Sequence, residues 1–185
     1  MLYLSLLKEY IERYGLKILA YCLIQKHVHF ICVPMREKSL SSVFNALHTR
    51  YSQYYNRKKN ITGHLWQGRF YSCVLDNGHL YAGIRYVENN PLRAGVVKRA
   101  EDYKWSSAKG HINKDSDPVL STDCYLTDDI KDWKKYLREK NDTALAQEIR
   151  KNSKTGRPCG DDGFVRRLER LLDRRLKALP HGRPR

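Results

Sequence analysis

An apolar run near the start of the chain restricts the fold more than any other feature. Residues 16–34 are mostly apolar, with Gln25 and Lys26 as a polar interruption. Strands in globular proteins usually have about 3–10 residues, so one strand cannot hold the whole run. The run therefore predicts two strands, at about 17–23 and 27–33, joined by a tight reversal or a bulge.

The second predicted strand carries two histidines. His27 and His29 are two positions apart, and side chains two apart leave the same face of a strand. Both imidazoles could then bind one divalent cation. A pair of strand histidines with a structural role is the alternative, and the spacing is compatible with both.

Helices are predicted on both sides of this hairpin. Apolar residues recur at helical spacing through Tyr14, and Gly15 ends the pattern as a C-terminal cap would. After the hairpin we expect a helix at about 39–57, with Ser39 as its N-cap. The predicted buried stripe of this helix is Leu40, Val43, Phe44 and Leu47.

A strand and another helix are predicted next. The sequence indicates a strand at about 70–75 and a helix at 78–89, which Asp76 and Asn77 would cap and Pro91 would end. Three weaker helical patterns follow. They are one around Asp128, Trp133, Tyr136 and Leu137, one at 142–151, and a short basic one with Phe164, Leu168, Leu171 and Leu172.

The charge of the chain points to a polyanionic partner. The net charge is +15, with 35 Lys and Arg against 20 Asp and Glu, which is typical of proteins that bind nucleic acid. A solvated surface without a ligand is the alternative. The basic C-terminal end, Gly-Arg-Pro-Arg with Arg183 and Arg185, favours nucleic acid because such pieces can lie along a minor groove.

Other composition features exclude some classes of protein. The five cysteines form no CxxC pair, and their odd number suits reduced thiols in the cytosol. No run of about 18 apolar residues predicts a membrane span. The N-terminal residues lack the basic region and the cleavage site of a signal peptide. We therefore expect a cytoplasmic protein.

Aromatic and basic residues crowd together between positions 48 and 71. Nucleic-acid bases stack on aromatic rings while Lys and Arg bind phosphates, so this mixture suits single-stranded or hairpin DNA. The alternative is that the rings cover the core and the charges face water. The candidate DNA-binding residues here are Arg50, Tyr54, Arg57, Lys58, Trp66 and Arg69.

Tyr86 and Asn90 form a second pair of candidate site residues. They are four residues apart, and so are neighbours on a helix surface if the last turn reaches Asn90. A phenol with a pKa of about 10 is a poor nucleophile until a cation polarises the phosphate that it attacks. On a helix lying over the histidine strand, the pair would supply a nucleophile and a third metal ligand.

Several motifs occur in an order that resembles one family. They are AYCLIQKHVH at 20–29, GHLWQGRF at 63–70, RYVENNPLRAGVV at 85–97, EDYKWSS at 101–107 and TGRP at 155–158. In this order they resemble the single-tyrosine HUH transposases (IS200-like transposase domain), and more closely the REP-associated tyrosine transposases of bacteria. HxH alone is unspecific, whereas HxH followed by Y-x-x-x-N-P-x-R-A-G is a strong signal.

The resemblance implies a fold, a reaction and a cofactor. The fold would be α+β, a ferredoxin-like antiparallel sheet with helices on one face (the HUH endonuclease fold). His27, His29 and Asn90 would hold Mg²⁺ or Mn²⁺, hard ions that keep open positions for phosphate oxygens. Tyr86 would attack single-stranded DNA, leaving a 5′-phosphotyrosine and a free 3′-OH.

The resemblance also implies partners and domains. Hairpin DNA with a single-stranded flank would be the substrate, with Arg93 among the DNA-binding residues. A homodimer would complete each site with a helix of the other subunit, and the protein would be nucleoid-associated. We expect a catalytic domain at 1–110, a helical extension at 111–150 and a basic tail with a short helix at 151–185.

Two departures from the family pattern bear on activity. In the family a first strand precedes the first helix, whereas this chain begins within that helix. The predicted sheet thus lacks that strand, so we expect either a start further upstream or a truncated copy. The second departure is Gln25 and Lys26 in place of a frequent Pro-Asn turn; Lys26 could contact phosphate, or the change could be neutral.

Three functional hypotheses follow. The leading one is a DNA-nicking and strand-transferring enzyme that carries out DNA transposition. The second is a truncated or domesticated protein that binds hairpin DNA without cutting it. An unrelated HxH metallohydrolase is the third, and we discount it because barrel hydrolases need about 250 residues and further acidic ligands.

Overall fold

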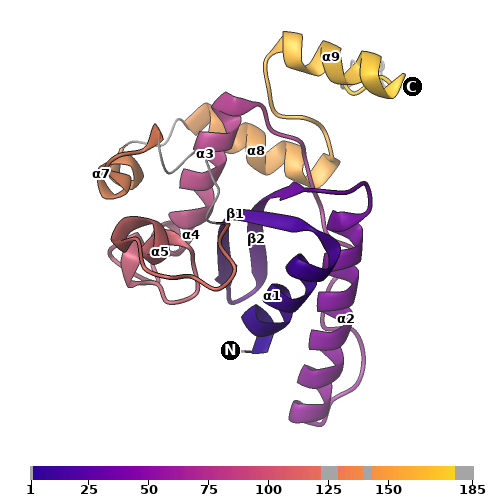
Figure 1. The fold of residues 1–185 in the computed structure, drawn as a ribbon, viewed down its shortest axis with the longest axis vertical. Helices are drawn as coiled ribbons and strands as arrows, with labels where there is room; N and C mark the ends of the chain where they lie inside the picture. The colour runs from indigo at the N-terminus through magenta and orange to yellow at the C-terminus, as the bar shows by residue number, and fades with distance from the viewer. Residues whose placement is uncertain (1, 122–128, 140–142, 178–185) are drawn as a thin grey trace, which may run out of the picture. The chain divides into compact units, whose positions relative to one another are not determined.

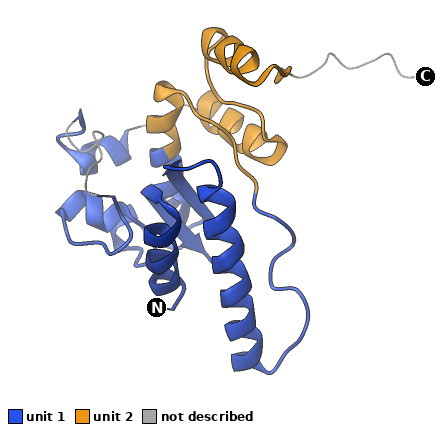
Figure 2. Ribbon diagram, turned by 45° about the vertical axis from the view of Figure 1, so that its right-hand side comes forward, with its two compact units in different colours: residues 1–70, 84–140 blue, residues 71–83, 141–185 orange. Residues whose placement is uncertain are grey.

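The computed structural model describes residues 2–121, 129–139 and 143–177 (Figure 1). The chain divides into two compact units (Figure 2). The first unit consists of Met1–Phe70 and Ile84–Lys140, and the second of Tyr71–Gly83 and Asn141–Arg185. Each unit therefore contains segments that are far apart in the sequence.

The predicted hairpin is confirmed and forms the centre of the first unit. Strand β1 (Leu16–Ile24) pairs antiparallel with strand β2 (His27–Pro34), with an irregularity between Ile18 and Ala20. β1 is buried along nearly its whole length, whereas β2 is partly exposed. The α+β class is confirmed, and in the described residues the named sheet contains these two strands.

The other edge of β1 is also hydrogen-bonded. The Leu23 amide donates to the Trp105 carbonyl (2.8 Å) and the Ser107 amide donates to the Tyr21 carbonyl (3.0 Å). At the opposite end, the amide of Ser121 donates to a β1 carbonyl at 2.9 Å. The buried strand thus satisfies backbone groups on both sides, as a buried strand must.

Two helices cover the hairpin. Helix α1 (Leu2–Tyr14) and helix α2 (Ser39–Lys59) pack against each other and against β1 (Figure 1). Gly15 ends α1 with a left-handed φ of 70°, as the sequence predicts. The shared core, which includes most of the predicted α2 stripe, consists of Tyr3, Leu7, Leu16, Ile18, Tyr21, Leu23, Val43, Phe44, Leu47 and Val119.

The predicted N-cap of α2 is wrong. The cap position is Lys38, and Ser39 is the first helical residue. The buried Ser39 hydroxyl donates to the Tyr14 carbonyl (2.7 Å) and accepts from the Arg36 amide (2.9 Å). The hydroxyl thus satisfies an orphan carbonyl at the end of α1 instead of an amide of its own helix.

The predicted helix after position 76 is confirmed, but the predicted strand before it is wrong. Helix α3 spans Asn77–Glu88, and the Asp76 carboxylate caps it by accepting the His79 amide at 2.8 Å. The segment before it forms only an isolated bridge, Leu75 with Cys159. A strand needs a series of backbone hydrogen bonds to a neighbouring strand, and this segment has one bridged residue.

Short helices complete the first unit. They are α4 (Asn90–Arg93), the 3₁₀ turn η1 (Ala100–Asp102), α5 (Ala108–Asn113) and α7 (Trp133–Arg138). The predicted apolar residues of α7 are buried, and Asp132 caps this helix by accepting the Lys135 amide at 2.9 Å. Asp128, which the sequence also placed in this region, lies outside the described residues.

The second unit contains two of the predicted late helices. Helix α8 spans Thr143–Thr155 and helix α9 spans Asp162–Leu172. Asp161 caps α9 by accepting the Phe164 amide at 2.7 Å. The Cys159 amide donates to the Val74 carbonyl at 2.8 Å, which joins the two sequence segments of this unit.

The described cysteines, Cys22, Cys32, Cys73 and Cys159, are free thiols. Cys124 lies outside the described residues. None of the described helices is long and apolar enough to cross a bilayer.

Candidate active site

The β-hairpin brings the two histidines together. His27 lies opposite Ile24 and His29 opposite Cys22 in the register of β1 and β2. The centroids of the two imidazole rings are 4.7 Å apart, and the ring planes are nearly perpendicular. His27 is exposed and His29 is partly buried, so the pair is open to a ligand on one side.

The surroundings of the pair favour neutral imidazoles. Burial, together with the nearby His27 and Arg93 charges, lowers the pKa of His29 to about 4. Burial also lowers the pKa of His27. Neutral imidazole has a free nitrogen lone pair, which is the form that binds metal ions.

Tyr86 lies directly beside the histidine pair. It is on α3, and its ring meets the His29 ring edge to face with centroids 5.9 Å apart. The two residues are on separate elements far apart in the sequence, so folding of the first unit creates this contact. The structure thus places the predicted nucleophile next to the predicted metal ligands.

Arg93 also contacts Tyr86. Its guanidinium carbon is 4.0 Å from the centroid of the Tyr86 ring, and its Nη1 donates to the Tyr86 carbonyl at 2.7 Å. Such a cation over an aromatic face is attractive. Arg93 is exposed, so its charge also faces any phosphate that approaches the tyrosine.

Asn90 is buried but does not continue the helix of Tyr86. α3 ends at Glu88, Asn89 is the N-cap residue of α4, and Asn90 begins α4. α4 packs against β1, the strand paired with the histidine strand. In the described residues no group of three or more His, Cys, Asp and Glu side chains could hold a metal ion. Asn90 offers an amide oxygen, a ligand type outside that set.

Sequence reasoning missed Glu88, which anchors the segment that carries Tyr86. Its side chain is fully buried and accepts hydrogen bonds from the Ser107 hydroxyl, from His111 Nδ1 (2.6 Å) and from Trp133 Nε1 (2.7 Å). The Ser107 hydroxyl in turn accepts from the Tyr21 amide of β1 at 2.9 Å. The signal was an acidic residue at helical spacing from buried apolar positions.

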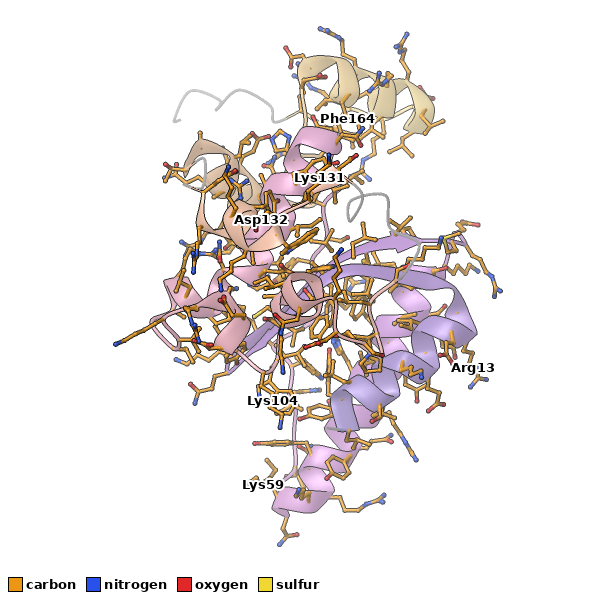
Figure 3. All side chains as sticks on the ribbon, turned by 60° about the vertical axis from the view of Figure 1, so that its left-hand side comes forward. Arg13, Lys59, Lys104, Lys131, Asp132 and Phe164 are labelled. Carbon is orange, nitrogen blue, oxygen red and sulfur yellow. The ribbon has the colours of Figure 1, made fainter. Side chains whose placement is uncertain are left out.

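Four of the predicted DNA-binding residues form one surface at the end of α2. Arg50, Tyr54, Arg57 and Lys58 are all exposed and recur every three or four residues, so they share a face of the helix. The Lys58 ammonium lies 5.7 Å from the Tyr54 ring centroid. Lys59, in the last turn, lies at the end of this helix (Figure 3).

Trp66 has a structural contact that the sequence did not reveal. Its indole stacks on His48 with ring centroids 4.1 Å apart, and its Nε1 donates to the His48 carbonyl at 3.3 Å. One face of the indole is therefore occupied within the fold. Arg69 is exposed. Arg183 and Arg185 lie outside the described residues.

Comparison with known proteins adds a family to this geometry. The family model described as "Transposase IS200 like" matches residues 2–90. The match covers slightly less than half of the chain and includes both histidines, Tyr86 and Asn90. It shows a similarity to IS200-like transposases over these residues. No curated protein and no solved structure matches the chain. The match ends at Asn90, so Arg93 and the two C-terminal helices lie beyond it.

Proposed function

We propose that this protein is a metal-dependent single-strand DNA endonuclease and strand transferase of the tyrosine HUH type. Its substrate would be hairpin DNA of the kind that REP-associated transposases use. One observation supports the proposal most: the Tyr86 ring contacts His29 beside His27, and the Arg93 guanidinium lies over the same ring. The family match over the same residues supports it independently.

The proposed reaction exchanges one phosphodiester bond for another. The Tyr86 oxygen attacks the phosphorus, the bond from phosphorus to the 3′ oxygen breaks, and the phenol proton is balanced by protonation of the leaving 3′ oxygen. The products are a 5′-phosphotyrosine and a free 3′-OH. Strand transfer is the reverse attack, by a 3′-OH on the phosphotyrosine.

The donor set fits a divalent cation that is incompletely coordinated by protein. His27 and His29 offer two neutral nitrogens, and Asn90 would add an amide oxygen. In the described part of the chain the Asn90 side chain has no hydrogen bond that would compete. A bound Mg²⁺ or Mn²⁺ would polarise the scissile phosphate as a Lewis acid.

The other side chains of the site orient Tyr86 and stabilise the negative charge that develops on the phosphate. Arg93 restrains the Tyr86 ring and carbonyl, so the phenol is held in one direction before DNA binds. The Arg93 charge also lies where negative charge develops on the phosphate. Through Ser107, Glu88 links the tyrosine helix to β1 and thereby to the histidine strand.

A covalent adduct tests the proposal. The protein is incubated with single-stranded hairpin DNA and Mn²⁺, and a DNA adduct is sought on a denaturing gel. Tyr86→Phe should abolish the adduct, whereas Tyr81→Phe, on the same helix, should keep it. An adduct that survives Tyr86→Phe would show that the nucleophile is another residue.

DNA binding without cleavage is the second candidate. One observation favours it: within the described residues β2 is paired with β1 alone, so the histidine strand has one supporting neighbour. This candidate predicts no adduct with any hairpin tested, together with binding that weakens steeply as salt rises.

We also propose that two copies associate and that the protein acts on the bacterial chromosome, in the cytoplasm. Sedimentation equilibrium tests the dimer. Mixing Tyr86→Phe with His27→Ala tests a shared site, because restored adduct formation in the mixture requires residues from two subunits.

A further inference from the structure

Helix α9 and the residues just after it carry a dense positive surface outside the family match. Five arginines are exposed there, and we call them the α9 arginine surface. They are Arg166, Arg167, Arg170, Arg174 and Arg175. They line an open hollow of about 990 Å³, whose lining also includes Lys177, Gly163 and two acidic residues, Glu169 and Asp173. The hollow has a strongly basic lining and room for a ligand.

The arginines repeat at helical spacing. Arg166 and Arg170 are one turn apart on α9, and Arg174 follows four positions later, just after the helix ends at Leu172. A step of four residues advances about 6 Å along a helix. Arg166 and Arg170 therefore lie along one line of the helix, and Arg174 adds a cation beyond the left-handed Asp173 that ends it, so the surface is more than a single charged point.

Two acidic residues of this region, Glu169 and Asp162, already have partners. Glu169 Oε1 accepts the Leu176 and Lys177 amides at 2.7 and 3.1 Å. Asp162 pairs with the Lys177 ammonium at 2.6 Å. In contrast, none of the five arginines makes a side-chain hydrogen bond or ion pair with another described residue. Arg166 and Arg175 act only through space, where their charges help to lower the pKa of Asp162 and of Glu169. The arginine charges are thus left for a ligand.

The other side of α9 is held in place within its own unit. Val165 is buried, and the Phe164 ring lies against Gly160 so closely that a methyl group at Gly160 would collide with it. Asp161 caps the helix. The α9 arginine surface is therefore presented on an anchored helix whose apolar side is partly covered, at Val165 and Phe164.

We propose that the α9 arginine surface binds the phosphate backbone of double-stranded DNA, the paired stem of a hairpin. This inference rests on the proposed function for its hairpin substrate. Guanidinium groups bind phosphate with two parallel hydrogen bonds. Eleven residues make a helix of roughly 16 Å, which spans about five phosphates of one duplex strand.

The lining of the hollow favours duplex over single-stranded DNA. Single-strand surfaces add aromatic rings on which unpaired bases stack. The lining residues include no aromatic side chain, in contrast to α2, where Tyr54 is exposed among cations. The two basic surfaces thus differ in the form of DNA that they suit.

An anionic membrane is the competing ligand, because Leu171 and Leu172 are 79% and 57% exposed. Helices that lie in a membrane interface need a broad free apolar face. Here the apolar side of α9 is partly occupied through Val165, and two leucines make a narrow remainder. DNA is therefore the better match for five unpaired cations.

Salt dependence of binding tests the inference on the full chain. Binding to a blunt duplex and to a single strand is measured by fluorescence anisotropy between about 50 and 200 mM KCl. Replacing Arg166, Arg170 and Arg174 by Gln should reduce the slope of log K against log salt by about 2.7 for duplex, since each phosphate contact contributes about 0.9. The single-strand slope should stay unchanged.

A matched variant controls for net charge. Lys8, Lys38 and Lys98 are exposed in the first unit, and changing all three to Gln removes the same charge. This variant should keep the duplex slope, and an equal fall in both variants would overturn the inference. Replacing the three arginines by Lys should keep most of the slope; far-UV circular dichroism checks that each variant is folded.

Two further outcomes separate the alternatives. An unchanged duplex slope in the arginine variant, with lost binding to phosphatidylserine vesicles, would assign the surface to membranes and overturn the inference. Adduct formation on a single strand without a stem should be normal in the arginine variant. If the unaltered protein forms no adduct on any DNA, the proposed cleavage fails, while the duplex slopes still decide the role of α9.

Discussion

Removal of the Glu88 carboxyl group is the most informative perturbation of the first unit. Glu88→Ala leaves three buried donors, on Ser107, His111 and Trp133, without their acceptor. Each unpaired buried donor costs about 1–3 kcal/mol, but water and side-chain shifts will recover part of that sum. Loss of one partner from a buried polar pair typically costs about 3–5 kcal/mol, and we expect Glu88→Ala in that range.

Glu88→Gln keeps the shape of the side chain but removes its charge and one of its two acceptor oxygens. The amide keeps one oxygen, but its NH₂ must face either the Trp133 N–H or the Ser107 and His111 side. At least one donor then loses its acceptor, so we expect a loss of about 1–3 kcal/mol. Trp133→Phe removes one donor and keeps an aromatic ring, and should cost less than Glu88→Ala.

Thermal and urea unfolding followed by circular dichroism measure these losses. For a chain of this length 1 kcal/mol lowers the melting temperature by roughly 2–4 °C, so Glu88→Ala should melt about 6–20 °C lower. Glu9→Ala, on the exposed side of α1, is the control and should melt like the unaltered protein. A melting temperature for Glu88→Ala equal to that of the control would refute the role of Glu88 as an anchor.

Three further outcomes are expected. Burial against Trp66 lowers the pKa of His48 to about 4. Stability should therefore fall as the pH drops from about 6.5 towards 4, because the unfolded chain then binds more protons. In His48→Gln the melting temperature should depend less on pH over this range. Burial alone would lower the pKa of His79, but hydrogen bonds to Asp76 and Glu148 outweigh it and raise the pKa. The stability that His79 contributes should be full below pH about 6.5 and be lost as the pH rises through the raised pKa. In His79→Gln this loss of stability with rising pH should be absent. Chelation with EDTA should abolish the DNA adduct, and excess Mn²⁺ should restore it; an adduct that is insensitive to EDTA would contradict a metal-dependent reaction.

The elements that the sequence predicted correctly are those that local pattern determines. The hairpin follows from an apolar run that is too long for one strand, and the end of α1 follows from Gly15. Ser39 was assigned wrongly because its hydroxyl bonds the Tyr14 carbonyl of another helix, a partner that no local pattern reveals. The strand expected at 70–75 failed for a similar reason, since its one bridge partner is Cys159.

In the candidate site, too, local pattern predicted some features and missed those that depend on distant segments. The spacing of His27 and His29 predicted that both rings leave one face, and their rings are indeed neighbours. The contact of Tyr86 with His29 joins residues far apart in the sequence, so only the resemblance to a family suggested it. Glu88 was missed because an acidic residue in a helix normally faces water, and the three donors that make its burial tolerable come from other segments.

The motif Y-x-x-x-N-P-x-R-A-G has a physical meaning in this fold beyond its list of reactive groups. Pro91 lies in the first turn of α4, where a missing amide proton costs nothing, and Gly95 adopts a left-handed φ of 67° just after that turn. This tight turn returns Arg93 to the Tyr86 ring and carbonyl.

Tyr86 and Glu88 are two positions apart on α3 and so face roughly opposite sides of the helix. Arg93 holds the tyrosine side, while the Glu88 hydrogen bonds hold the buried side. A nucleophile gains most from restraint that exists before the substrate binds, since no binding energy is then needed to orient it. The motif therefore encodes a prearranged tyrosine, and loss of Arg93 or Glu88 should slow adduct formation more than it weakens DNA binding.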